Sequence, residues 1–342
     1  MKTPLLTFIL IINAMICFSQ SKISDALLED IQQARGSGKT VEAMIYLADQ
    51  FDTQALDQQL TRQKATCHER GVAVVTALME HAERTQAELI SYLESRKGTD
   101  VIRYKTYWIT NVLFVEAKPD ALLDFAQHRD VAQLEQNERL ELIKPVATQP
   151  ASRLPGHAEP GLYAVNAHKM WQLGLTGEGV VVGNMDTGVE GSHPAVGWNW
   201  HGNSVPASQA WHDQTGLTTF PTDEDGHGTH TTGTMAGLDS GTSDTIGVAF
   251  GSEWICARIV SWTENEIIGN FQWLINPDGN PNTTEDMPVV VNNSWGGSSN
   301  CTPAFIDAIL NLEAAGVAVI FSAGNSGPNA STIDSPAIDS AL

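Results

Sequence analysis

Four short apolar runs in the second half of the chain constrain its fold more than any other feature. The runs are residues 180–182, 255–260, 289–291 and 317–321. Continuous apolar runs of this length are typical of parallel strands that are covered on both faces. Asp186, Ser294 and Asn325 follow three of the runs. The pattern predicts an α/β fold with a parallel sheet, and it places these three side chains on the carboxyl-end rim where such sheets bind ligands.

A helix is predicted between the last two runs. Thr302 is the expected N-cap, Pro303 suits the first helical position, and Gly316 would end the helix. The spacing predicts an apolar face and a face turned to water. The apolar face would hold Phe305, Ile309 and Leu312, and the water face would hold Asp307 and Glu313.

Residues 21–144 differ in composition from the rest of the chain and are rich in Gln, Glu, Leu and Ala. Apolar positions recur with mostly helical spacing over residues 56–96. Strand-like runs are expected at residues 44–47, 101–108 and 112–115, and a helix is expected from Pro119 to about Gln127. The order strand, helix, strand, strand, helix, strand predicts a small α/β plait.

The remaining segments divide the chain into four parts. Residues 1–20 read as a secretory signal peptide, with Lys2 before a mostly apolar stretch. Residues 145–161 are rich in Pro and Gly and predict an exposed linker with a processing region. Residues 162–342 form the predicted second domain. The protein is therefore expected to be secreted or extracellular, with the periplasm as an alternative.

The net charge limits the classes of partner to expect, and the cysteine content bears on disulfide bonding. The chain has 40 acidic and 19 basic residues, a net charge of -21, which disfavours nucleic acid and anionic membranes. Without the signal peptide, Cys67, Cys256 and Cys301 remain, and three scattered cysteines do not form a disulfide framework. Cys256 is expected to be a buried thiol in a strand.

The segment that most strongly indicates catalysis is Asp225-Gly226-His227-Gly228-Thr229-His230. His227 suits a general base, and Asp186, after the first strand, suits the carboxylate that orients it. A metal site formed by His227 and His230 is the alternative, but the helical zinc motif needs His-Glu-x-x-His, which is absent here. His230 is expected to be a structural, hydrogen-bonded residue.

Asp186, then His227, then Ser322-Ala323-Gly324-Asn325 occur in an order that resembles the subtilisin-like serine proteases, or subtilases. The resemblance covers about residues 162–342. It is closest to the bacillopeptidase F type, judged by residues 176–182 and 292–297. It implies a subtilisin-like catalytic domain, which would be incomplete here, and it identifies residues 21–144 as an inhibitor-like prodomain.

The resemblance also implies roles for individual residues. Asp186 and His227 would be catalytic, and Asn325 would donate to the oxyanion. The segment Ser294-Trp295-Gly296-Gly297 would pair with the backbone of a peptide or protein substrate, and Ala323 and Gly324 would complete that site.

Two departures from the family pattern matter. No Gly-Thr-Ser-Met-Ala type segment occurs, so the nucleophile is expected beyond residue 342. No cofactor is expected: Ala195 stands where the family often has a calcium-binding Asp, and the acidic run 223–225 is interpreted as a solvated loop rather than a cation site. The expected function is that of a secreted serine endopeptidase precursor with its own prodomain as a partner. The alternative is an inactive pseudoprotease or peptide-binding module.

Overall fold

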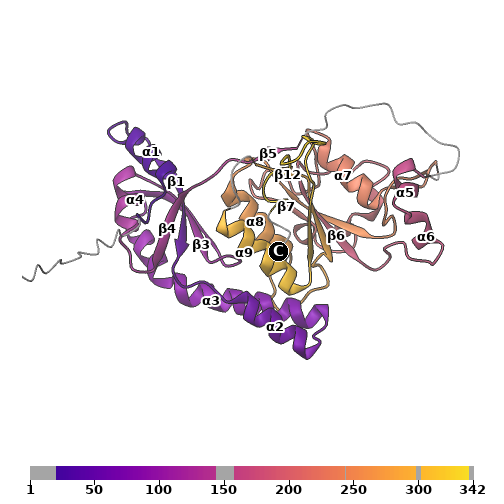
Figure 1. Cartoon of the computed structure of the whole chain (residues 1–342), viewed down its shortest axis with the longest axis horizontal. Helices are drawn as coiled ribbons and strands as arrows, with labels where there is room; N and C mark the ends of the chain where they lie inside the picture. Colours follow the sequence, from indigo (N-terminus) through magenta and orange to yellow (C-terminus); the bar gives the residue numbers. More distant parts are fainter. Residues whose placement is uncertain (1–20, 144–157, 243, 298–301, 339–342) are drawn as a thin grey trace, which may run out of the picture.

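The computed structural model describes residues 21–143, 158–242, 244–297 and 302–338. The proposed signal peptide, most of the linker, Cys301 and the last four residues lie outside these ranges. Two units lie side by side, each built on its own main sheet (Figure 1). No helix in the described ranges is both long and apolar enough to cross a membrane.

The N-terminal unit, residues 21–143, contains a four-stranded antiparallel sheet with strand order β2-β3-β1-β4. Its elements follow the predicted order, with additional helices α1 and α2. They are α1 (Asp25–Ala34), β1 (Val41–Leu47), α2 (Thr53–Gln63), α3 (Cys67–Ser95), β2 (Val101–Tyr107), β3 (Val112–Ala117), α4 (Pro119–Phe125), β4 (Val131–Gln136) and the short β5 (Glu141–Leu142).

The single helical stretch expected over residues 56–96 is in fact two helices. Lys64 adopts a left-handed conformation that ends α2. Thr66 then starts α3 with a capping box, in which its side chain and that of Glu69 each accept the other residue's backbone N–H. The apolar spacing continues across this break, which is why periodicity alone did not reveal it.

The C-terminal unit, residues 158–338, contains a five-stranded parallel sheet with order β13-β11-β6-β10-β7. This is the predicted α/β fold, and all four apolar runs are strands. The strands are β6 (Val181–Asp186), β7 (Trp211–Asp213), β8 (Leu238–Asp239), β9 (Asp244–Thr245), β10 (Glu253–Arg258), β11 (Val290–Asn293), β12 (Trp295–Gly296) and β13 (Ala318–Phe321). The helices are α5 (Pro160–Ala164), α6 (Ala167–Trp171), α7 (His227–Ala236), α8 (Glu264–Leu274) and α9 (Pro303–Ala315), with short 3-10 turns at Gly197–Asn199, His201–Asn203 and Ala207–Gln209.

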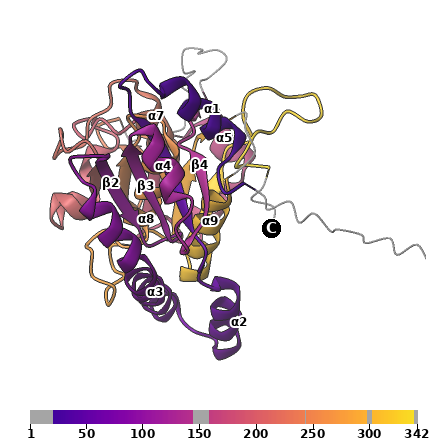
Figure 2. The same ribbon diagram turned by 90° about the vertical axis from the view of Figure 1, so that its left-hand side faces the viewer.

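The two units share a hydrophobic core. Alternation along β1 sends Met44 and Tyr46 to the face that packs against the C-terminal unit, while Ile45 joins a separate core under α1 and α4. The shared core includes Phe271 of α8 and Phe305 of α9. In the view from the side of the N-terminal unit, α8 and α9 lie behind its sheet (Figure 2). These two helices are therefore covered on both sides.

This packing corrects one expectation for α9. Phe305, Ile309 and Leu312 are buried as predicted, and Glu313 is exposed. Asp307, however, is half-buried and lines a pocket against the N-terminal unit. The sequence pattern shows which side of the helix is most apolar, but it does not show that a second partner covers the polar side.

Candidate active site

Asp186 and His227 come together at the carboxyl end of the parallel sheet. Asp186 is the last residue of the central strand β6, and His227 is the first residue of α7. The Nδ1 atom of His227 lies 2.8 Å from Oδ1 of Asp186. The side chain of Asp186 is fully buried, whereas that of His227 is 9% exposed. The pair thus has one solvent-shielded carboxylate behind a more accessible imidazole.

Both carboxylate oxygens of Asp186 accept hydrogen bonds. Oδ1 also receives the backbone N–H of Thr187 at 2.7 Å, and Oδ2 receives the hydroxyl of Thr231 at 3.1 Å. A buried charge is costly unless such donors replace water. These contacts also fix the orientation of the carboxylate that orients the imidazole.

The pKa of His227 is raised from its ordinary value. The largest cause is its hydrogen bond to Asp186, which outweighs the opposing effect of burial. Asp225 and Asp223 add smaller contributions through their charge. The imidazolium is thereby stabilised, which is the state that a general base reaches after it has accepted a proton.

Glycine allows the backbone of α7 to approach β6 closely. A Cβ atom on Gly228 would lie 2.0 Å from the carbonyl oxygen of Gly188 and 3.1 Å from Cβ of Asp186. Gly188 itself has a φ of 126°, and its Cβ would meet the carbonyl oxygen of Thr222 at 2.1 Å. Larger residues at these two positions would separate the imidazole from its carboxylate.

Asp223 is a site residue whose role the sequence did not reveal. It was expected to be part of a solvated loop, but it is half-buried and accepts five hydrogen bonds. Its Oδ1 accepts from the hydroxyl of Thr187 and from two backbone N–H groups, and its Oδ2 accepts from both the N–H and the hydroxyl of Thr229. These bonds join the residue after Asp186 to the first turn of α7. Four of these donor groups lie within six residues of Asp223 and the fifth, on Thr187, lies 36 residues away, a combination that no sequence spacing rule identifies.

The other expectations for this region have mixed outcomes. Cys256 is a buried thiol in β10, as predicted. His230, which was predicted to be a structural, hydrogen-bonded residue, is exposed on α7. Burial and nearby carboxylates raise the pKa of the Cys256 thiol well above its ordinary value, so this group is inert.

The proposed substrate-binding residues lie on the same rim. Ser294 follows β11, and Trp295 and Gly296 form β12. Trp295 is fully buried, edge-on to the rings of Phe305 and Phe321. The N–H of Gly297 donates to the carbonyl of Ser335 at 3.0 Å. Strand β13 ends at Phe321, so the segment Ser322–Asn325 continues from the neighbouring strand end.

A segment of the N-terminal unit already pairs with β12. Strand β5 is antiparallel to β12, with Leu142 opposite Trp295 and Glu141 opposite Gly296. The side chain of Ile143 lies so close that a Cβ on Gly296 would be 3.3 Å from its Cδ1 atom. The end of the N-terminal unit therefore pairs with β12, the strand that was predicted to pair with substrate.

Residues 177–338 match the model of the subtilase family. Bacillopeptidase F of Bacillus subtilis (strain 168) is 32% identical over 279 residues, which cover 76% of this chain. Subtilisin DY of Bacillus licheniformis is 32% identical over 186 residues, or 52% of this chain. Residues 177–338 therefore form a domain of the subtilase family, as the motifs predicted.

A solved structure supports the same fold. A mutant of the epidermin leader peptide processing serine protease from Staphylococcus aureus aligns with a TM-score of 0.53 at 13% identity, over 85% of this chain and 62% of that chain. The chain spans 19% of bacillopeptidase F and 59% of subtilisin DY. These comparisons show the family and the fold of the matched residues.

Proposed function

We propose that this chain is part of a secreted serine endopeptidase precursor that hydrolyses peptide bonds by an Asp-His-Ser mechanism. The observation that supports this most strongly is the contact between Asp186 and His227 at 2.8 Å, on the sheet rim beside the peptide-pairing strand β12. The proposal of secretion rests on the signal-like sequence of residues 1–20.

In the proposed reaction, Asp186 accepts a hydrogen bond from the Nδ1–H of His227, which keeps the proton on Nδ1 and leaves Nε2 to act as the base. His227 takes the hydroxyl proton of the nucleophile and later returns it to the leaving amine. Asn325 would donate to the oxyanion that forms at the scissile carbonyl. This chemistry requires no cofactor.

The nucleophile itself is proposed to lie outside these 342 residues, because no Gly-Thr-Ser-Met-Ala type segment occurs in the sequence. Ser294, Ser322 and Ser326 are present, but none lies in such a segment. The same observation is what favours the alternative function, a pseudoprotease or peptide-binding module that uses the cleft without cleaving its ligand.

The N-terminal unit is proposed to be a prodomain that inhibits the peptidase. A substrate would add a strand to β12 through backbone hydrogen bonds, and Ser294 to Gly297, with Ala323 and Gly324, would border it. Strand β5 makes that antiparallel pairing within the chain. Any substrate must therefore displace β5 before it can bind.

The test is to express the natural gene product, with whatever follows residue 342, beside the 342-residue chain. We expect the longer product to hydrolyse casein and to react with a serine-directed fluorophosphonate, and we expect His227→Ala to lose both properties. The 342-residue chain should do neither above background. A natural product with an intact fold, peptide binding at β12 and no labelling would establish the pseudoprotease alternative instead.

A further inference from the structure

We propose that the N-terminal unit carries a second docking surface for the C-terminal unit, separate from β5. This surface is the arm, which we define as α2 together with the first half of α3, residues 53–79. It contacts the C-terminal end of α9 and the loop between α8 and β11, residues 276–289. In Figure 1 the arm lies at the bottom of the molecule, whereas β5 and β12 lie at its top.

Gly71 is the clearest sign of a built contact. It lies inside α3 and is buried. The three atoms that a Cβ at this position would meet first all belong to the 276–289 loop, with Cγ2 of Thr284 at 2.7 Å and Cε of Met287 at 3.1 Å. Glycine weakens a helix interior relative to alanine. Its presence here is explained by the close approach of the loop rather than by a need of the N-terminal unit.

Polar contacts surround this point. Nδ1 of His68 lies 2.7 Å from the hydroxyl of Thr284. Arg70 donates to the carbonyl of Ala314 at 3.0 Å, in the last turn of α9, where helices have unsatisfied carbonyls and a partial negative charge. Asp57 and Thr61 of α2 hold the same guanidinium at 2.7 and 2.6 Å. The arm therefore presents a positioned cation to the end of α9.

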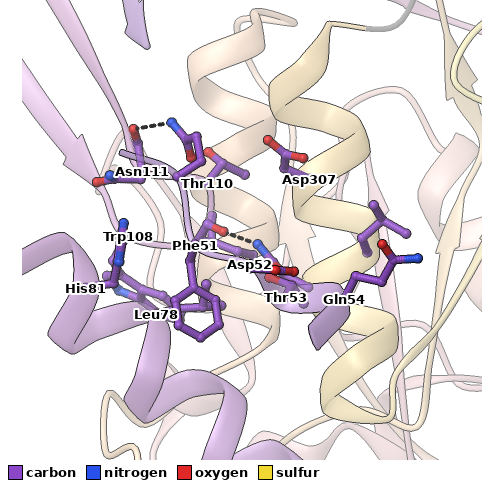
Figure 3. Close-up of a pocket in the computed structure, with 14 residues that line it drawn as sticks. Phe51, Asp52, Thr53, Gln54, Leu78, His81, Trp108, Thr110, Asn111 and Asp307 are labelled. Atoms are coloured by element: carbon purple, nitrogen blue, oxygen red, sulfur yellow. Dashed lines mark hydrogen bonds between the residues drawn. The ribbon is translucent and has the colours of Figure 1, made fainter. Parts of the chain in front are cut away.

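The arm meets the middle of the interface at the pocket drawn in Figure 3, which has a volume of about 180 Å³. The start of α2, the tip of the β2–β3 hairpin and α9 all contribute to its walls. Asn311 of α9 links the start of α2 to the tip of the hairpin, because its side chain accepts from the hydroxyl of Thr53 and donates to the carbonyl of Ile109. These contacts connect the arm to the shared core.

Two attachment points at opposite ends of one interface have a thermodynamic consequence. While the arm is docked, β5 stays near β12 at a high effective concentration, so its pairing is an intramolecular event. Cutting the linker should then leave the N-terminal unit bound, and displacement of β5 alone should not release it. The role of this retention in inhibition rests on the proposed function, but the docking itself does not.

The experiment uses the full chain with a recognition sequence for a specific protease inserted between residues 145 and 157. After cleavage, a dilution series followed by native mass spectrometry gives the dissociation constant of the two units. We expect Gly71→Leu to raise it at least tenfold and Gly71→Ala to raise it less. Ala87→Leu is the matched control, because it adds a larger side chain at an exposed position of the same helix and should leave the constant unchanged.

A rescue variant tests the contact directly. Thr284→Ser removes Cγ2 but keeps the hydroxyl that faces His68, so it should restore most of the affinity lost in Gly71→Ala. Hydrogen exchange should show α3 equally protected in Gly71→Ala, since alanine favours the helix. Leu142→Pro should block β5 pairing yet leave the cleaved units associated.

Three results would overturn the proposal. One is an unchanged dissociation constant in Gly71→Leu, and the other is complete release of the N-terminal unit by Leu142→Pro alone. Loss of affinity in Ala87→Leu equal to that in Gly71→Leu would also overturn it, because the effect would then come from α3 itself. No hydrolysis is measured, so the outcome is independent of whether the proposed peptidase activity is correct.

Discussion

Two fully buried carboxylates, Asp186 at the sheet rim and Glu264 at the interface between the units, have opposite surroundings. Both are 0% exposed. Asp186 accepts from an imidazole, a backbone N–H and a hydroxyl, and both of its oxygens are used. Glu264 accepts from the hydroxyls of Tyr46 and Thr302, both at Oε1. Its Oε2 has no hydrogen-bond partner among the residues that the structure describes.

The difference shows how environment assigns a role to the same chemical group. Burial raises the pKa of Glu264 to about 7; the hydrogen bonds from Tyr46 and Thr302 oppose this rise, and the charge of Glu138 adds to it. The neutral form of Glu264 is therefore favoured below about pH 7 in the folded protein. The donors around Asp186 instead suit an anion that faces a positive imidazole. The surroundings at the rim therefore suit a charged carboxylate, whereas those of Glu264, under the N-terminal unit, suit a neutral one.

The largest expected effect concerns Asp186. In the nucleophile-bearing enzyme that we propose, Asp186→Asn should reduce kcat by about 10⁴-fold, because an amide orients the wrong imidazole tautomer and does not stabilise the imidazolium. Peptide hydrolysis kinetics measure this. Asp225→Asn, which changes an exposed carboxylate two residues before His227, should cost far less. Equal losses in the two variants would mean that Asp186 has no special role.

The oxyanion donor should come next. Asn325→Ala should lower kcat by about 10²–10³-fold and leave KM nearly unchanged, because the donor acts on charge that develops in the transition state. Steady-state kinetics on one peptide separate the two parameters. A rise in KM with kcat intact would instead assign Asn325 to ground-state binding of substrate.

Much of this architecture was predictable because it depends on local patterns. Continuous apolar runs marked β6, β10, β11 and β13, since strands covered on both faces need apolar residues throughout. The order of the polar residues after those runs then predicted that Asp186 and Asn325 share one edge. Parallel strands place their carboxyl ends together, so this part of the site follows from topology.

The rest depends on contacts that sequence spacing does not encode. Asp223 was misread because its donors are three backbone N–H groups and two threonine hydroxyls that only the folded chain brings together. Asp307 was expected in water, but residues of the N-terminal unit, distant in the sequence, cover that face of α9. Nothing in the sequence indicated a role for Gly71, because the need for glycine there comes from the close approach of a loop of the C-terminal unit.

Asp223 should give an intermediate effect that sharpens the contrast between the two carboxylate sites. Asp223→Ala removes the acceptor from the first turn of α7 and should lower the free energy of unfolding by about 1–2 kcal/mol. It should also lower the pKa of His227, because the charge of Asp223 helps to raise it. Chemical denaturation and NMR titration of His227 in the full chain measure both. Asp223→Asn should cost less stability but produce a similar pKa change, and an unaltered His227 pKa in both variants would contradict the assignment.

The smallest effect should appear at Glu264, and it depends on pH. Because the folded-state pKa is raised to about 7, the neutral side chain stabilises the fold fully below the unfolded-state pKa. This stabilisation is lost as the pH rises from about 4.5 through 7. Glu264→Gln keeps an acceptor for Tyr46 and Thr302 but cannot ionise. The Tm of the variant relative to the parent chain should therefore increase from pH 5 to pH 8, by a few degrees. The exposed Glu178→Gln should show no such trend. If the two Tm curves of Glu264→Gln and the parent chain ran parallel across this range, Glu264 would hold a charge as Asp186 does, and the comparison between the two carboxylates would fail.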